Sequence, residues 1–154
     1  MSTQALKNGK TIQELTGFTD SIRITHADLT DTDTAETINL AVKAGTQVRN
    51  VAFKLHTAFD GGSTSNLTLQ VGDSTDVDAF VSNSIIHVDS TEENYGPSVA
   101  AGVGGKLGKV FAADGNINML FTSTGANINV LDAGDIEIFF NLVHVDEFAG
   151  RQVS

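Results

Sequence analysis

Cysteine and tryptophan are absent from the 154 residues, and proline occurs once, at Pro97. A chain without cysteine has neither a disulfide scaffold nor a thiolate metal site. Basic residues are scarce too, because nine Lys and Arg stand against nineteen Asp and Glu and leave a formal charge of −10. An acidic surface repels phosphate backbones, so we expect no nucleic acid among the partners.

Long apolar runs are also missing. A membrane-spanning helix needs roughly 18 or more consecutive apolar residues, and the chain has no such run. The first 17 residues contain no apolar segment of signal-peptide length. We therefore expect no membrane partner. Hydrophobic residues still make up 40% of the chain, which is enough for one domain with one core.

Short apolar runs alternate with clusters of Gly, Thr, Ser, Asn and Asp, a spacing typical of all-β proteins. Leu67, Leu69 and Val71 share one face of their segment, whereas Thr68 and Gln70 share the other. No segment keeps a helical period, so we predict an all-β fold, an antiparallel two-sheet sandwich of jelly-roll type with eight or more strands. The expected strands lie within residues 21–29, 37–42, 48–59, 66–73, 78–80, 85–88, 107–112, 117–121, 128–131 and 136–145.

Residues 1–17 differ from the remainder because they are polar and lack a strong period. We predict an extended N-terminal arm over residues 1–17, with a short helical turn around Thr11–Leu15, followed by a single β-sandwich domain over residues 18–154. Lys7 and Lys10 are the only charged residues before Glu14, so the arm is locally basic. That suits contact with an acidic surface, and it suits two solvated lysines equally well.

The segment 136–145 is the longest and most apolar of the expected strands. Its apolar side chains occur on both faces: Ile136, Ile138, Phe140 and Leu142 on one, Phe139, Val143 and Val145 on the other. A strand that is apolar on both faces is covered on both. A one-domain sandwich has no second layer for the outer face, so we expect a homo-oligomer.

A His-Val-Asp phrase occurs twice, at residues 87–89 and 144–146. A His and a carboxylate two residues apart on a strand point the same way, so His87 and Asp89 form one edge of a two-His-one-carboxylate iron site. His144 is then the candidate third ligand, and Arg151 a clamp for the carboxylate of a 2-oxo acid. This is the arrangement of cupin-like enzymes.

Strand alternation argues against the iron site. If Ile86 and Val88 face the core, His87 and Asp89 face solvent, where no concave pocket holds them. We therefore assign no catalytic, cofactor-binding or metal residue and expect no cofactor. His144 is interpreted as a residue at the edge of an interface.

Two acidic clusters are candidate cation sites, Asp28, Asp31, Asp33 and Glu36 in the first and Asp73, Asp76 and Asp78 in the second. Neither has the Gly that a calcium loop needs at its sixth position, so both are interpreted as solvated turns. The glycine-rich segment 96–108 lacks the Ser or Thr that follows the Lys of a phosphate loop. A carbohydrate-binding sandwich is disfavoured, because Tyr95 is the only polar aromatic residue.

Four phrases point to a family: "THADLTDTDTAETINL", "AGTQVRNVAFKLHTAFDGG", "LTLQVGDSTDVDAFV" and "LDAGDIEIFFNLVHVDE". Over roughly residues 22–147, their order resembles the head-decoration (cement) proteins of tailed bacteriophages. The resemblance implies a jelly-roll-like virion protein, made in the host cytoplasm, that sits on the capsid surface as a homotrimer. It implies the major capsid protein as partner, a mechanical role and no catalytic residues.

Other functions stay open at this point. A tail, neck or fibre component of a phage is the nearest alternative, because the same β architecture serves all of these structures. A cupin-like metal enzyme using His87, Asp89 and His144 belongs to a different class. We expect a non-enzymatic virion structural protein.

Overall fold

The computed structural model describes residues 18–88 and 107–145. The predicted arm at 1–17, with Lys7, Lys10 and the turn at Thr11–Leu15, lies outside these residues. So do Asp89, Tyr95, Arg151 and nearly all of the glycine-rich segment 96–108.

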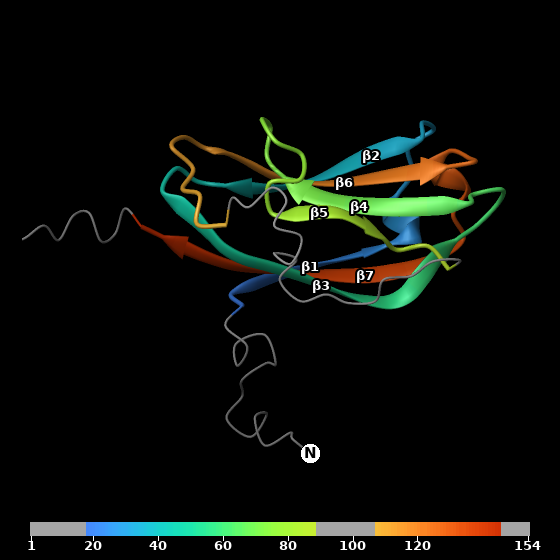
Figure 1. Ribbon diagram of the computed structural model, residues 1–154, viewed down its shortest axis with the longest axis horizontal. Helices are drawn as coiled ribbons and strands as arrows, with labels where there is room; N and C mark the ends of the chain where they lie inside the picture. Colours follow the sequence, from blue (N-terminus) through green and yellow to red (C-terminus); the bar gives the residue numbers. More distant parts are fainter. Residues whose placement is uncertain (1–17, 89–106, 146–154) are drawn as a thin grey trace, which may run out of the picture.

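Within the described residues, seven strands form two antiparallel sheets that lie in two layers (Figure 1). One sheet has the order β1-β7-β3 and the other β2-β6-β4-β5. The predicted all-β sandwich is confirmed, while its jelly-roll type stays a prediction. The elements are β1 (Asp20–Thr25), η2 (His26–Asp28), β2 (Ala35–Val42), β3 (Thr46–Asp60), β4 (Asn66–Gly72), β5 (Val81–Ile85), β6 (Gly115–Thr124), η4 (Ile128–Val130) and β7 (Ala133–His144).

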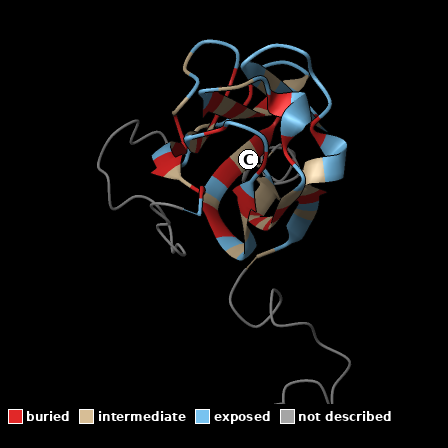
Figure 2. Cartoon of the chain, turned by 90° about the vertical axis from the view of Figure 1, so that its right-hand side faces the viewer, coloured by how far each residue is buried: buried red, intermediate tan, exposed pale blue. Residues whose placement is uncertain are grey.

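The core fills the space between the layers, where the buried residues gather (Figure 2). Rows of apolar side chains run across each sheet, as in the row that joins Ile22, Ile138 and Phe53 through β1, β7 and β3. In the other sheet, Leu69 lies opposite Phe121. The alternation read from residues 66–73 is confirmed, because Leu67, Leu69 and Val71 are fully buried.

Four expected strands are wrong, and one of them, residues 85–88, shares only Ile85 with β5. Residues 78–80 form a turn, in which the Ala79 amide donates to the Asp76 carbonyl. Residues 107–112 form no strand of their own: they hydrogen-bond to the start of β3 around an isolated bridge from Val110 to Gln47, and Gly108 leaves the extended conformation with a φ of 96°. Residues 128–131 form a 3₁₀ turn, because Ile128 and Leu131 are three residues apart and both point into the core.

Gly134 begins the buried row of β7, and the ring of Phe59 lies against it. A Cβ at Gly134 would stand 2.0 Å from the Phe59 Cδ1 atom, and the φ of 141° is itself unfavourable for other residues. Phe59 is fully buried and packs on Phe121, with ring centroids 6.2 Å apart. The glycine therefore allows the two sheets to close at this end.

We predict that Gly134→Ala lowers the free energy of unfolding by about 2–4 kcal/mol, because the methyl group displaces a core ring. Gly108→Ala is the matched control: its φ is also positive, but nothing lies within 4 Å of the added atom. It should cost only about 1 kcal/mol. Urea denaturation of both variants measures the difference, and equal losses would contradict the steric argument.

Candidate functional surfaces

His87 is buried, with 1% of its surface exposed, so its predicted position in solvent is wrong. The alternation fails because the chain changes sheets here. The Ile86 amide donates to Leu67 of β4, whereas the Val88 amide donates to Phe59 of β3. At such a corner two consecutive residues, Ile86 and His87, are both buried. Val88 was expected in the core but is 45% exposed. The imidazole Nε2 of His87 lies 3.7 Å from Oδ1 of Asp60.

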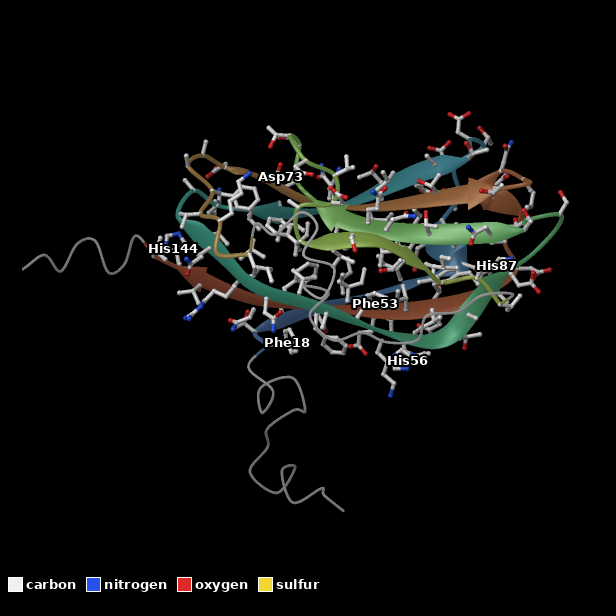
Figure 3. The ribbon with its side chains drawn as sticks, viewed as in Figure 1. Phe18, Phe53, His56, Asp73, His87 and His144 are labelled. Carbon is white, nitrogen blue, oxygen red and sulfur yellow. The ribbon has the colours of Figure 1, made fainter. Side chains whose placement is uncertain are left out.

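The two histidines of the hypothetical iron site lie at opposite ends of the molecule (Figure 3). His144 is paired with Thr46 at the first residue of β3, whereas His87 bridges to Phe59 near its last. At about 3.3 Å per residue the two positions are roughly 40 Å apart along the strand. One ion cannot bind both. No group of three metal-ligating side chains occurs among residues 18–88 and 107–145.

The carboxylates of the first acidic cluster bind backbone amides. Oδ2 of Asp28 accepts hydrogen bonds from the amide (2.8 Å) and the hydroxyl of Thr25, which begins the 3₁₀ turn η2. Oδ1 of Asp31 accepts from the Asp33 amide at 3.1 Å, and Oε2 of Glu36 accepts from the Asp31 amide at 3.0 Å. These side chains therefore shape the connection between β1 and β2.

Asp73 is the buried member of the second cluster, with 2% of its surface exposed. Its Oδ1 accepts hydrogen bonds from the amide and hydroxyl of Thr75 and from the Asp76 amide, and its Oδ2 pairs with the ammonium of Lys109. Burial alone would raise the pKa of this carboxyl, but the bonds from Lys109 and Thr75 outweigh burial and lower the pKa to about 2. Asp73 thus ties the turn after β4 to the segment that runs along β3.

The outer face of the β1-β7-β3 sheet carries charged side chains that pair with one another. The Arg23 guanidinium donates two hydrogen bonds to Asp135, at 2.8 and 2.7 Å, and these bonds lower the pKa of that carboxyl. His56 Nε2 lies 3.1 Å from Oε1 of Glu137. One outward apolar residue of β7, Phe139, packs on Phe18 at 5.8 Å between ring centroids. The chain itself therefore covers part of this face.

The outer face of the β2-β6-β4-β5 sheet is different, because its outward strand positions carry no charged side chain. Strand register places Thr37, Leu120 and Gln70 in one outward row across β2, β6 and β4. The neighbouring rows contain the same residue types. The outward residues are Ala35, Thr37, Asn39, Ala41, Asn66, Thr68, Gln70, Asn83, Ile85, Asn116, Asn118, Leu120, Thr122 and Thr124.

A charge-free face is unexpected on a chain with a formal charge of −10. Interface cores are depleted of charged residues, so this face is the strongest candidate interaction surface among the described residues. Sequence reasoning missed it, although the alternating Thr and Asn positions in 35–41 and 116–124 were visible. Recognising the charge-free face requires knowing which strands lie side by side in the sheet.

We predict that Asp73→Asn lowers the free energy of unfolding near neutral pH by about 2 kcal/mol. The pKa of Asp73 is lowered by folding, so its contribution is present above about pH 4 and is lost as the pH falls towards about 2. The wild type should therefore lose stability relative to Asp73→Asn over that interval, as measured by urea denaturation across pH. The control Asp114→Asn removes an exposed partner of Lys43 and should change stability less. Parallel pH curves for wild type and Asp73→Asn would contradict the prediction.

In the part of the chain that the structure describes, no helix has the length and apolarity needed to cross a membrane. Comparison of the chain with protein-family models, with curated proteins and with solved structures finds no match. No residue role is therefore transferred from a relative. The architecture follows from the chain's own strand pairing.

Proposed function

We propose that this chain is a non-enzymatic structural protein of a tailed-phage virion, which binds the outside of the capsid as an oligomer and stabilises the head. The sequence resemblance over roughly residues 22–147 suggests this class and, within it, a trimer bound to the major capsid protein. The observation that carries the proposal is the contrast between the two outer faces. The outer face of the β1-β7-β3 sheet carries charged side chains that pair with one another. The outer face of the β2-β6-β4-β5 sheet is broad, and its strand positions carry no charge.

The use of the polar side chains supports a mechanical role. Asp28, Asp31 and Asp73 hold turns in place through backbone amides. His87 is buried at a corner between sheets, far from His144. Those candidate groups that the structure describes are thus committed to the fold or separated from one another, while large surfaces are left for contact.

The net charge supports an external position. A formal charge of −10 disfavours contact with packaged DNA inside a head, whereas the outer shell presents protein. A protein that contacts several capsid subunits at once gains avidity, because each contact after the first is intramolecular. Holding neighbouring subunits together in this way opposes the outward pressure of packaged DNA.

Addition of the purified chain to phage heads that lack it tests the proposal. We expect saturable co-sedimentation with heads and release of DNA at a higher temperature. Deletion of residues 1–17 should weaken attachment at least about ten-fold while the β domain unfolds at an unchanged temperature, because the arm adds contacts outside the sandwich. Binding to tails alone, or to neither particle, would overturn the capsid role.

A further inference from the structure

Strand β2 has the longest uninterrupted open edge among the described strands. It lies at the margin of its sheet and pairs with β6 over eight consecutive residues without a register shift. The other edges are protected. β3 pairs with residues 108–111 at one end and with residues 86–88 at the other, and its middle is interrupted by register shifts and carries Arg49 and Lys54. β5 has only five residues, and β1 carries Asp20 and Arg23. Proteins blunt exposed edges with charge, shortness, bulges or cover, and β2 has none of these along its length except Glu36.

The backbone groups that face this edge can be assigned. In an antiparallel ladder, residues whose amide and carbonyl face the partner strand alternate with residues whose groups face away. The Thr34 carbonyl accepts a hydrogen bond from the Ser123 amide of β6 at 2.7 Å, so the even-numbered residues of β2 face β6. The groups of Ala35, Thr37, Asn39 and Ala41 therefore face the open edge. No strand of residues 18–88 and 107–145 pairs with them.

We propose that the open edge of β2 pairs antiparallel with β2 of a second copy of this chain, around a twofold axis at Ile38. The pairing joins the two β2-β6-β4-β5 sheets into one sheet of eight strands, four from each copy. A second copy carries the same formal charge of −10, so only a surface without net negative charge allows close approach. The edge and the adjoining face meet this condition, and hydroxyl and amide side chains both donate and accept hydrogen bonds.

Charge complementarity fixes the register. An axis at Ile38 places Lys43 of one copy opposite Asp33 of the other, and this pair occurs twice by symmetry. Both residues are exposed: Asp33 lies in the bend two residues before β2, and Lys43 directly follows the last residue of β2. Glu36 then lies opposite Leu40 of the second copy, so no like charges meet. Lys43 Nζ lies 3.3 Å from Asp114 in the single chain, and that exposed ion pair leaves the lysine available.

This contact rests on the self-association part of the proposed function and not on its capsid part. A twofold pair does not close a trimer, so in a shell of trimers it links one trimer to the next. It therefore predicts a dimer of the free chain in solution, without heads, with the trimer forming only on the capsid. The two proposals can fail separately, since solution association and head binding are different measurements.

The absence of cysteine allows a direct test by single-cysteine cross-linking. Ile38→Cys places two thiols across the axis at a pair whose Cα atoms lie about 4.5 Å apart, within the range that a disulfide bridges. We expect a covalent dimer after mild oxidation. Leu40→Cys is the matched control, because Leu40 is equally half-buried on the same face of β2 but lies opposite Glu36 of the second copy. It should remain uncross-linked.

Asn39→Pro supplies a second test that leaves the β6 ladder intact, because the amide it removes faces the open edge. Sedimentation equilibrium should show the wild type as a dimer and Asn39→Pro at least about ten-fold weaker in association, with unchanged circular dichroism. Asn118→Lys changes the neighbouring residue of β6 on the same face, and we expect its dimer to persist. Should Asn39→Pro not fold, Asn39→Lys takes its place against the same control.

Several results would overturn the edge pairing: a monomeric wild type at high micromolar concentration, equal cross-linking of Ile38→Cys and Leu40→Cys, or equal weakening by Asn39→Lys and Asn118→Lys. A monomer that still binds heads would overturn the pairing and leave the capsid role standing. A dimer that pairs through β2 but binds no head would support the pairing and overturn the capsid role.

Discussion

The structure depends on the burial of the inward rows of the two central strands, β7 and β6. Ile136, Ile138 and Phe140 of β7 and Met119 and Phe121 of β6 are fully buried between the sheets. Each such side chain contributes about 1.5–3 kcal/mol when removed from water. Each outer strand is held by its ladder to one of these two or, for β5, to β4. Because the inward rows secure the fold, the outward rows are free to differ.

The outward rows of the two sheets differ in charge. The outward row of β7 includes Asp135 and Glu137, which pair with Arg23 and His56 across the sheet. The outward positions of β6 are uncharged, with Leu120 between Asn118 and Thr122. A chain with a large negative charge has few places where another acidic surface can approach closely. The β2-β6-β4-β5 face and its open edge are the places that this fold provides, and so both proposals concern contact and not chemistry.

The sequence was informative wherever a strand keeps to one sheet. Period-two alternation identified β4 and β7 and their buried faces, because only inward positions tolerate continuous apolar residues. It failed where the chain changes sheets or turns within the core. His87 is buried because residues 86–88 pass from β4 to β3, and Ile128 and Leu131 are buried through a 3₁₀ turn. The charge-free face was not predicted, since it joins positions from four strands whose order the sequence does not state.

The central claim is that this chain acts by occupying the outside of a phage head. Under the proposal a tailed phage encodes the chain, and cryo-microscopy of its virions tests the claim most directly. The account predicts repeated density on the outer surface of the head into which the β1-β7-β3 and β2-β6-β4-β5 layers fit, in contact with the major capsid protein. Heads without such density, with the chain found only in the tail or in no part of the particle, would contradict it.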